Sequence, residues 1–366
     1  MTRIPGRGRD EGVFLIAANT TRGNGSGRPS GRDNNMKLAI VGTGMIVDLV
    51  GAHLPEWGCD VTAVVGTPGT KERVMELATS LGGTGWTDYA QMLEQTTAEE
   101  VDTVYVAVPN FLHHDFCRQA LEAGRNVIVE KPMCSNAREA AELASLARER
   151  GLLLFEAISN VYQPTYARIR ELLPRVGDVK IVSLNYSQYS HRYDAFREGT
   201  VLPAFDPAKS GGALMDLGLY CLQWVCGLFG EPESVSYAAN VERGIDTSGV
   251  TTLDYGSFKA VAVAAKDCAG PSASVIEGTD GYVLQATPPN MCGPVELHLN
   301  DGTVETYDEN PELQWESEFR SFAADAGRGD EGLAHCYRML ERSLLVSRIQ
   351  TEARLGAGVR FPADEA

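Results

Sequence analysis

MKLAIVGTGMIV, residues 36–47, decides how the rest of the chain is interpreted, because it is either a nucleotide-binding turn or an ordinary strand that runs into two glycines. Residues 38–41 form an apolar run typical of a buried parallel strand, and Gly42-Thr43-Gly44 follows it directly, before a helix-compatible segment. In a dinucleotide-binding fold the first glycine makes the tight turn and the second lets the backbone approach the pyrophosphate. Val47 stands where the full fingerprint has a third small residue, so this motif alone leaves both interpretations open.

Strand-like and helix-like segments alternate after this turn. The predicted strands are 61–65, 104–108, 126–129 and 152–155, and the predicted helices are 71–81, 116–124 and 136–150. Repeated β-α units of this size predict an α/β domain with a parallel, doubly wound sheet, whose ligands bind at the carboxyl ends of the strands. Polar clusters fall at those ends, at residues 66–67, 109–110, 130–131 and 156, and this coincidence favours a nucleotide site.

The pattern changes beyond residue 158. Five β-rich runs (179–187, 234–241, 250–255, 259–265 and 295–299) surround one helix-like segment after Gly212, and two helical stretches (313–326 and 331–353) close the chain. This pattern predicts a second domain of α+β type with an open, largely antiparallel sheet. The predicted organisation is therefore a disordered tail at 1–35, a dinucleotide-binding domain at 36–157 and an α+β domain at 158–366.

Length and composition limit the functional classes. At 366 residues the chain should hold two domains, since a domain typically has about 100 to 200 residues. A formal net charge of −17 repels nucleic acid and anionic lipid, and no apolar run approaches the ~18 residues of a membrane span. Residues 1–35, rich in Arg, Gly, Asn and Ser, predict a disordered tail and not a targeting peptide.

The cysteines and histidines do not predict a metal site. The eight cysteines are scattered without a Cys-x-x-Cys pair, a pattern typical of buried free thiols in a reducing compartment. His113 and His114 are adjacent, and neighbours in sequence do not face one metal ion from a regular helix or strand. We therefore expect no metal and a cytoplasmic location.

Four motifs in order carry a family resemblance: Gly-Thr-Gly-Met-Ile at 42–46, Val-Pro-Asn-Phe-Leu-His-His at 108–114, Glu-Lys-Pro at 130–132 and Gly-Gly-Ala-Leu-Met-Asp-Leu-Gly-Leu-Tyr at 211–220. From residue 36 to about residue 362 the chain resembles the Gfo/Idh/MocA oxidoreductases, and within them the branch of the dihydrodiol dehydrogenases, which carry tyrosine where inositol dehydrogenases carry histidine. The resemblance implies an N-terminal Rossmann domain, a C-terminal sheet domain often used for oligomerisation, and hydride transfer from a nicotinamide.

Lys131, Asp216 and Tyr220 are the predicted catalytic residues. Lys131 follows a strand end, so its ammonium should reach the cleft and stabilise developing alkoxide charge. Asp216 and Tyr220 lie four residues apart and share one face of a helix, and a tyrosine near a lysine can act as general acid. The family assigns catalysis to this lysine and the acid role to the residue matching Tyr220. The alternatives are a solvated Lys-Pro turn and an ordinary core tyrosine.

Cofactor choice depends on the end of the second strand. An acidic residue about 20 positions after the glycine turn would bind the ribose hydroxyls of NAD, but this chain has GTPGTKER at 66–73. Thr67, Lys71 and Arg73 can bind a 2′-phosphate, and Glu72 is the only carboxylate in the segment, so NADP is predicted over NAD. The residues predicted to contact the cofactor, from strand-end position and the resemblance together, are Gly42, Thr43, Gly44, Met45, Ile46, Thr67, Lys71, Arg73, Val108, Pro109, Asn110, His113, Glu130 and Lys131.

Four further residues lie outside the catalytic set. Asn110 and His113 match the family motif that contacts the nicotinamide ribose and pyrophosphate region, but a structural role for His113 stays open. Tyr162 and Arg192 are candidates for the substrate side, without a supporting motif.

The predicted function is an NAD(P)-dependent oxidoreductase that interconverts a secondary alcohol and a carbonyl on a sugar, polyol or dihydrodiol-like substrate, in a homodimer or higher homo-oligomer. Two alternatives come from other classes: a glycosidase that uses bound NAD for transient oxidation, and a sensor that binds NAD(P) without chemistry. The combination of Lys131 and Tyr220 disfavours a sensor, because binding alone requires neither residue.

Overall fold

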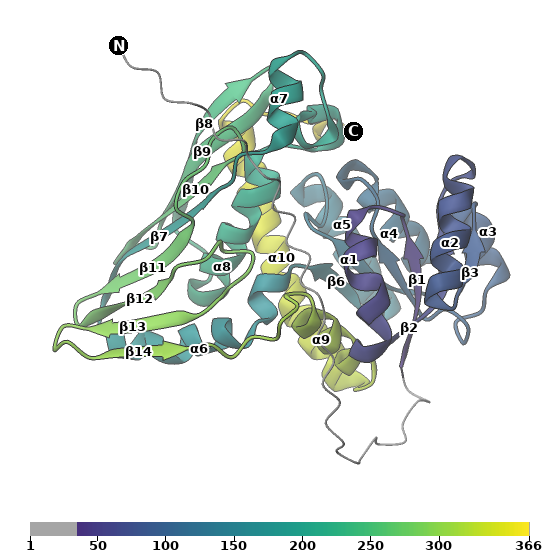
Figure 1. Ribbon diagram of the computed structural model, residues 1–366, viewed down its shortest axis with the longest axis horizontal. Helices are drawn as coiled ribbons and strands as arrows, with labels where there is room; N and C mark the ends of the chain where they lie inside the picture. The colour runs from purple at the N-terminus through teal and green to yellow at the C-terminus, as the bar shows by residue number, and fades with distance from the viewer. Residues whose placement is uncertain (1–34, 366) are drawn as a thin grey trace, which may run out of the picture. The chain divides into compact units, whose positions relative to one another are not determined.

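The computed structural model describes residues 35–365, which form two lobes, each built around one β-sheet (Figure 1). The predicted tail lies outside the described residues, apart from Asn35. All eight cysteines are unpaired, and all except Cys268 are buried. Within residues 35–365 no three His, Cys, Asp or Glu side chains gather in a way that could hold a metal ion.

The first lobe contains a six-stranded parallel sheet in the order β3-β2-β1-β4-β5-β6. Its strands are β1 (Met36–Val41), β2 (Cys59–Val65), β3 (Thr84–Trp86), β4 (Thr103–Val106), β5 (Asn126–Glu130) and β6 (Leu154–Ala157). Its helices are α1 (Met45–Val50), α2 (Lys71–Leu81), α3 (Tyr89–Gln95), α4 (His113–Glu122) and α5 (Ala137–Arg150). The strand order reverses between β1 and β4, which confirms the predicted doubly wound sheet and locates its ligand crevice.

Local sequence signals explain several helix ends in this lobe. The Asn136 side chain caps α5 by accepting a hydrogen bond from the Glu139 backbone N–H, and Gly151 ends the helix in the left-handed conformation. α1 has only six residues before a 3₁₀ helix, Gly51–Trp57, continues the chain. Val47 is buried in this short helix, so the site of the missing third glycine is part of the apolar core.

The second lobe contains an eight-stranded sheet in the order β14-β13-β12-β11-β7-β10-β9-β8. Its strands are β7 (Val179–Ser187), β8 (Ser234–Glu242), β9 (Ile245–Asp254), β10 (Lys259–Ala265), β11 (Ala273–Gly278), β12 (Gly281–Gln285), β13 (Val295–Leu299) and β14 (Val304–Tyr307). The β7–β10 pair is parallel and every other neighbouring pair is antiparallel, in agreement with the predicted largely antiparallel sheet.

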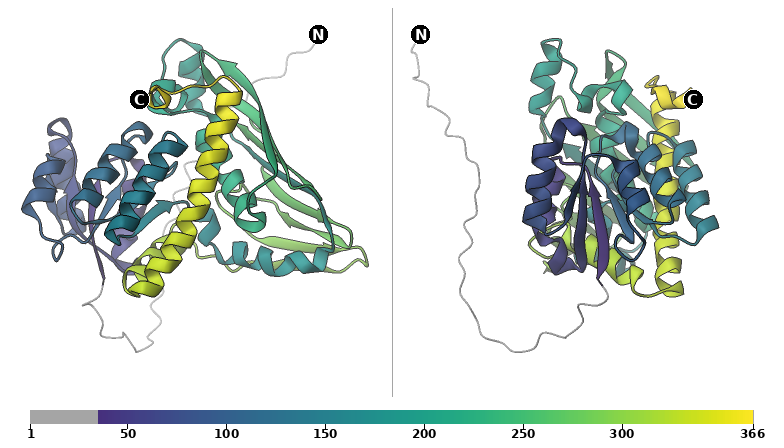
Figure 2. Two further views of the ribbon diagram at one scale, coloured as in Figure 1. Left: turned by 180° about the vertical axis from the view of Figure 1, so that it is seen from behind. Right: turned by 90° about the vertical axis from the view of Figure 1, so that its right-hand side faces the viewer.

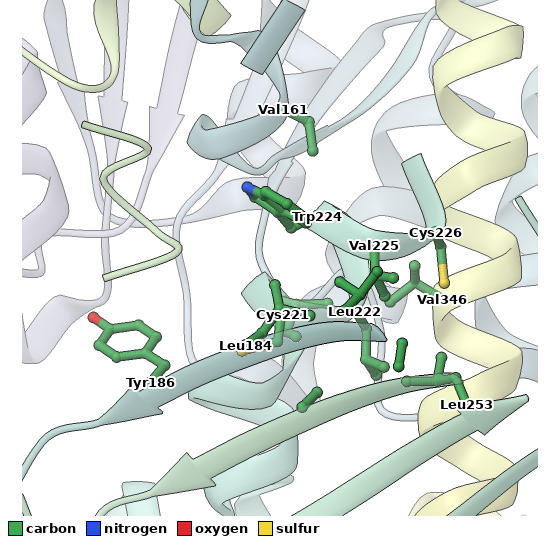
Figure 3. Close-up of a cluster of buried hydrophobic side chains, with 14 of the residues drawn as sticks. Val161, Leu184, Tyr186, Cys221, Leu222, Trp224, Val225, Cys226, Leu253 and Val346 are labelled. Atoms are coloured by element: carbon green, nitrogen blue, oxygen red, sulfur yellow. The ribbon is translucent and has the colours of Figure 1, made fainter. Parts of the chain in front are cut away.

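Helices cover one face of this larger sheet (Figures 1 and 2). The helices after β6 are α6 (Pro164–Leu172), α7 (His191–Arg197), α8 (Leu219–Phe229), α9 (Glu316–Ala326) and α10 (Asp330–Gly356). In the lobe's core, Leu222, Trp224 and Val225 of α8 are buried with Leu184 of β7 and Leu253 of β9 (Figure 3). Among the described residues, one helical segment, Pro207–Phe229, is long and apolar enough to cross a membrane, but 72% of its 18-residue apolar stretch is buried inside the protein, as expected for a core helix.

The last two helices join the lobes. α10 contacts α5 and β6 of the first lobe as well as α8 and β8 of the second. From α9, the Phe322 ring stacks on Phe155 of β6 at 4.6 Å, and the Phe319 ring meets Tyr105 of β4 edge-on at 5.4 Å. Residues from the C-terminal part of the chain therefore complete the core of the first lobe.

Candidate active site

A cleft with a volume of about 660 Å³ lies at the carboxyl ends of β1, β2 and β4. Of the residues predicted to contact the cofactor, six line this cleft: Gly42, Thr43, Gly44, Thr67, Val108 and Pro109. Its wall is mostly apolar, with Val41, Val65, Leu112 and Phe116 among the lining side chains. An apolar crevice at the switch point of a doubly wound sheet is the usual location of a bound dinucleotide.

Gly42 and Gly44 serve different purposes in the turn between β1 and α1. Gly42 has φ +128°, and a Cβ atom there would lie 2.2 Å from the Ala107 backbone oxygen, so only glycine fits. A Cβ atom on Gly44 would meet nothing within 4 Å, so its small size is not required by the protein's own packing. Since Gly44 lines the cleft and has no side chain, a ligand can approach the protein backbone closely at this position. The turn therefore fits a pyrophosphate.

The end of β2 borders the same cleft. The Thr67 backbone N–H donates to the Thr70 hydroxyl, and Thr67 lines the cleft while Lys71 and Arg73 line a shallow hollow beside it. Arg73 already forms ion pairs with Asp48 and Glu76, whereas the described residues give Lys71 no ion-pair partner.

Asp88 also lines the cleft, where its carboxylate caps α3 by accepting from the Gln91 backbone N–H. Glu72 is therefore not the only carboxylate nearby. Glu72 is the only carboxylate in residues 66–73, the segment after β2. Asp88 lies outside that segment and reaches the cleft from the loop after the neighbouring strand β3.

Lys131, Asp216 and Lys266 form a chain of ion pairs at the junction of the lobes. Lys131 Nζ donates to Asp216 Oδ1 at 2.7 Å, and Lys266 Nζ donates to Asp216 Oδ2 at 2.5 Å. Lys131 follows β5 of the first sheet and Lys266 follows β10 of the second, while Asp216 lies in a π-helical turn, Leu214–Gly218, that leads into α8. The structure thus brings two of the predicted catalytic residues together and adds Lys266, which no sequence motif indicated.

The two lysines keep Asp216 ionised. Burial alone would raise the pKa of this carboxyl, but the charges of Lys131 and Lys266 outweigh it and hold the pKa well below its usual range. Burial would likewise lower the pKa of Lys131, but the Asp216 carboxylate outweighs it, so the pKa of Lys131 is raised. Lys131 therefore stays a cation throughout the physiological pH range.

Tyr220 lies against the same lysine. Lys131 Nζ is 5.0 Å from the centre of the Tyr220 ring, and the Tyr186 ring meets Tyr220 at 6.0 Å. Burial raises the pKa of Tyr220 more than the Lys131 charge lowers it, so the phenol stays protonated at neutral pH.

Tyr220 also lines a second hollow, of about 210 Å³, which we call the inner hollow. Its lining residues are Met45, Ile46, Leu49, Glu130, Lys131, Ala157, Ser159, Tyr220, Gln314, Trp315 and Glu318. The predicted contacts Met45, Ile46 and Glu130 therefore line the same hollow as Lys131.

Two carboxyl groups of the inner hollow have raised pKa values. Burial raises the pKa of Glu130, whose Oε1 accepts from the Tyr105 hydroxyl at 2.5 Å. Glu318, from α9, is 1% exposed, and burial together with the nearby Glu130 and Glu156 raises the pKa of Glu318 well above its usual range. Glu318 Oε2 has no hydrogen-bond partner among the described residues. Burial and the neighbouring carboxylates therefore disfavour the charged form of Glu318.

A third hollow, of about 160 Å³, which we call the substrate-side hollow, lies between the lobes. Its lining residues are Pro109, Asn110, Arg192, Pro203, Ala204, Lys209, Gly211, Asp216 and Lys266. Pro109 also lines the cofactor-sized cleft, so the two spaces adjoin. The structure places Asn110 here, where its Nδ2 donates to the Ser210 backbone oxygen at 3.1 Å, and it places the weakly supported Arg192 here as well.

Two predicted residues do not reach any of these spaces. The ring nitrogens of His113 lie 2.8 and 2.9 Å from the backbone oxygens of Pro132 and Val108, and the side chain is fully buried. These contacts connect the loops before α4 and after β5 and leave no ring nitrogen for a ligand. Tyr162 packs edge-on against Phe322 at 5.2 Å in the interior.

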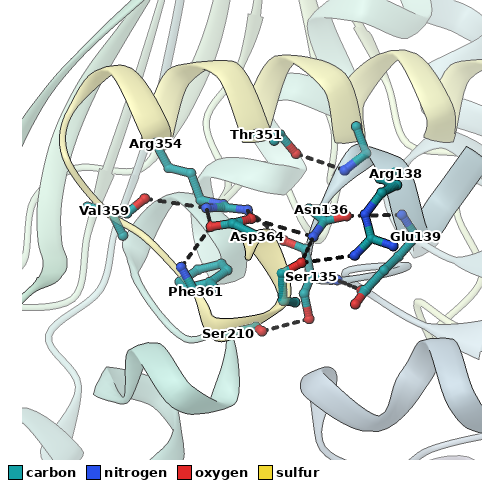
Figure 4. Close-up of polar contacts among 12 residues, drawn as sticks. Ser135, Asn136, Arg138, Glu139, Ser210, Thr351, Arg354, Val359, Phe361 and Asp364 are labelled. Atoms are coloured by element: carbon teal, nitrogen blue, oxygen red, sulfur yellow. Dashed lines mark hydrogen bonds and ion pairs between the residues drawn. The ribbon is translucent and has the colours of Figure 1, made fainter. Parts of the chain in front are cut away.

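A polar network holds the Lys131 loop against the second lobe (Figure 4). The buried Arg354 guanidinium donates to both carboxylate oxygens of Asp364 at 2.6 Å and to the Ser135 backbone oxygen at 3.0 Å. The Ser210 hydroxyl donates to the Ser135 hydroxyl at 2.7 Å. The loops that carry Lys131 and Lys209 are therefore fixed to each other by bonds outside the site.

Family comparisons agree with this architecture. Residues 36–158 match the model described as "Oxidoreductase family, NAD-binding Rossmann fold", and residues 166–284 match the GFO/IDH/MocA C-terminal domain. The chain belongs to the Gfo/Idh/MocA oxidoreductase family. The predicted family and fold class are confirmed, and so is the prediction of an NAD(P)-dependent dehydrogenase or reductase.

Named members of the Gfo/Idh/MocA family resemble the chain over much of its length. It is 33% identical to scyllo-inositol 2-dehydrogenase (NADP(+)) of Bacillus subtilis over 343 residues, which cover 90% of this chain and 100% of the relative. It is 32% identical to trans-1,2-dihydrobenzene-1,2-diol dehydrogenase of Xenopus tropicalis, over 58% of this chain and 63% of the relative. A 3-ketoreductase from Actinomadura kijaniata, solved with NADP and TDP-benzene, shares the fold with a TM-score of 0.74 at 23% identity, over 90% of this chain and 99% of that one.

Proposed function

We propose that the protein is an NADP-preferring oxidoreductase that interconverts a secondary alcohol and a carbonyl on a small polyol or sugar-like ring, with Lys131, Asp216 and Tyr220 as its catalytic residues. The observation that carries this proposal is the position of Lys131. Its ammonium is bonded to Asp216, which lines the substrate-side hollow, and lies over the Tyr220 ring in the inner hollow. The lysine therefore lines the inner hollow and is bonded to a residue of the substrate-side hollow.

The Lys131 cation would stabilise the reacting oxygen. A bound nicotinamide supplies or accepts the hydride, and the substrate oxygen carries negative charge when hydride arrives at its carbon. A fixed ammonium in a half-buried site stabilises that charge without having to reorganise. Asp216 keeps Lys131 protonated and holds it in place, and Lys266 keeps Asp216 from turning away.

Tyr220 is placed to exchange the proton with that oxygen. Because its pKa is raised by burial, the phenol is a stable proton donor in the direction of carbonyl reduction. In the opposite direction Lys131 would favour the phenolate through its charge.

NADP preference is supported by the segment after β2. Thr67 lines the cleft and Lys71, next to it, has no ion-pair partner among the described residues, so both are available to a 2′-phosphate. The Bacillus subtilis relative carries NADP(+) in its name, and the Actinomadura kijaniata enzyme was solved with NADP. The Gly42-Thr43-Gly44 turn and the Val108-Pro109 segment would hold the rest of the dinucleotide.

We also propose a cytoplasmic homo-oligomer that forms through the uncovered face of the eight-stranded sheet. No described helix covers this face (Figures 1 and 2). Ile181, Val250, Tyr282 and Val304 are exposed there, on strands whose neighbouring residues point into the core. An exposed apolar sheet face of this kind is typical of a protein–protein contact. Light scattering after size exclusion measures the mass directly, and a monomer would contradict this part of the proposal.

The first experiment is a fluorescence titration of the purified protein with NADPH and, separately, with NADH. We expect saturable binding with tighter affinity for NADPH, followed by turnover of NADPH with a panel of ketoses and inososes that includes neutral members, keto acids of sugars and ketose phosphates. Loss of turnover in Lys131→Met, with Lys180→Met as an exposed control, would support the lysine's role. Binding without turnover of any substrate would favour the sensor, and bond cleavage without net NADPH consumption would favour the glycosidase.

A further inference from the structure

The substrate-side hollow is basic in a protein that is strongly acidic overall. The chain carries 49 acidic and 32 basic residues. Yet Arg192, Lys209 and Lys266 line this hollow, and Asp216 is its only lining carboxylate. Asp216 already forms ion pairs with Lys131 and Lys266, so its negative charge is balanced by these two lysines and does not neutralise Arg192 or Lys209.

Arg192 and Lys209 have no ion-pair partner among residues 35–365. Other arginines at the surface of the described part of the chain do form ion pairs, as Arg175 does with Glu305 and Arg168 with Glu309. Two cations that line one hollow without ion-pair partners repel each other, so an anion bound in that hollow would be stabilising.

The loop that carries Lys209 is positioned by contacts that leave its charge free. Lys209 Nζ lies 3.8 Å from the centre of the Phe111 ring, which belongs to the first lobe. Asp206 caps the short 3₁₀ turn Pro207–Lys209 by accepting from the Ala208 backbone N–H, and Asn110 bonds to the following residue, Ser210. An aromatic ring orients the ammonium without neutralising it, so its N–H donors remain available to a ligand.

Building on the proposed function, we infer that the natural substrate carries an oxyanion, a carboxylate or a phosphate monoester, which binds Arg192 and Lys209 while the reacting hydroxyl or carbonyl lies at Lys131 and Asp216. The guanidinium matches the planar fork of a carboxylate or the edge of a phosphate, and the ammonium adds a point charge. The hollow's volume of about 160 Å³ is too small for an oligosaccharide, so the expected substrate is a small molecule. The enzyme would therefore act on a sugar acid or sugar phosphate, and neutral inositols, aldoses and dihydrodiols would be poor substrates.

Isothermal titration of the full chain with three matched probes tests this inference. The probes are D-glucuronate, D-glucose 6-phosphate and D-glucose, each with and without saturating NADPH. We expect at least one anionic probe to bind about tenfold or more tightly than D-glucose, because a hydrogen bond to a charged group contributes more than one to a neutral group. The stronger of the two anions identifies the carboxylate or the phosphate as the recognised group.

Variants of the two cations locate the site. Arg192→Gln and Lys209→Gln should each weaken the preferred anion about tenfold and leave D-glucose unchanged. Arg197→Gln, on the same helix as Arg192 but outside the hollow, is the matched control and should bind like the wild type. All three side chains are at least partly exposed, so the variants should fold, and melting curves confirm it.

The inference is overturned if neither anion binds more tightly than D-glucose, or if the preferred anion binds equally well to Arg192→Gln and Lys209→Gln. The NADPH titration separates this failure from failure of the proposed function. If NADPH binds but neither anion is preferred over D-glucose, the oxyanion site is refuted and the proposed function is not. Anion binding that responds to both variants, with no NADPH binding, keeps the site and removes the oxidoreductase.

Discussion

Replacing the carboxylate that bridges the two lysines, as Asp216→Asn, should change both the pH profile and the stability of the enzyme. At the Lys131–Asp216 distance of 2.7 Å, two unit charges interact with about 6 kcal/mol at an effective dielectric constant of 20. The Asp216 side chain is 35% exposed, so solvent screening reduces the expected loss to about 2–3 kcal/mol. With an unfolding entropy of about 2 cal/mol/K per residue, this loss lowers Tm by about 3–5 °C.

The pH dependence follows from the signs of the two pKa shifts. The depressed pKa of Asp216 contributes stability that is present above the unfolded pKa of about 3.9 and is lost as the pH falls below it. The raised pKa of Lys131 contributes stability that is present below the unfolded pKa of about 10.4 and is lost as the pH rises through the folded pKa. The Tm difference between wild type and Asp216→Asn should therefore stay constant from about pH 5 to 9 and narrow in acid.

The activity of Asp216→Asn should fall at alkaline pH. Without the carboxylate, burial and the neighbouring Lys266 both disfavour the Lys131 cation, so its pKa falls below the ordinary value of about 10.4. The reductase kcat/KM of Asp216→Asn, measured from pH 6 to 10, should decline toward pH 10, where the wild type stays flat. Lys266→Met is the control, because it leaves the Lys131–Asp216 pair intact and should keep the flat profile. A flat profile in Asp216→Asn, or the same decline in Lys266→Met, would refute the reasoning.

Three further predictions concern the acid, the cofactor and the turn. Tyr220→Phe should lower kcat at least about 100-fold with unchanged NADPH affinity in the fluorescence titration, and full activity would assign the proton to another group. Thr67→Asp should shift the ratio of NADPH to NADH affinity at least about tenfold toward NADH, and an unchanged ratio would remove the account of cofactor choice. Gly42→Ala should cost about 2–4 kcal/mol of stability, because Gly42 has a φ of +128° and a Cβ atom there would lie 2.2 Å from the Ala107 backbone oxygen. Gly44→Ala should keep the wild-type Tm and weaken NADPH binding. Equal melting temperatures of the two variants would contradict the different roles assigned to the two glycines.

The first lobe could be predicted well because its signals are local. A strand, a glycine turn and a helix occupy residues 36–50 without interruption, and Asn136 and Gly151 delimit α5 by caps that sequence alone reveals. The short strands β3, β11, β12 and β14 were not predicted. Runs of only three to six residues that include glycine or a charged residue show no clear alternation of apolar and polar side chains. α4 begins three residues before its predicted start, since residues 113–115 are polar but helical.

The residues around Lys131 were predictable where a family motif marked them. Lys131, Asp216 and Tyr220 stood in recognisable motifs, and the structure brings them together. Lys266 and Glu318 lie in segments that resemble an ordinary strand end and an ordinary amphipathic helix. Lys266 and Glu318 reach the site only because β10 and α9 lie next to the loop after β5 in the folded chain. That arrangement cannot be deduced from local sequence. Asp216 and Tyr220 still share a face, although a π-helical turn replaces the expected α-helix, because four residues come close to one full turn in either geometry.

The distribution of charge also determines how a substrate must lie. Lys131, Asp216 and Lys266 together carry one net positive charge, and Arg192 and Lys209, which line the substrate-side hollow with Asp216 and Lys266, add two more. Since charges are screened beyond about 8 Å at physiological ionic strength, the protein's overall charge of −17 has little effect inside the hollow, and the local cations decide the orientation. An oxyanion placed at Asp216 would have to compete with a carboxylate already bound by two lysines, whereas at Arg192 and Lys209 it meets cations without partners. The anionic end should therefore point away from Lys131, which leaves the neutral, hydroxylated end at the reacting position.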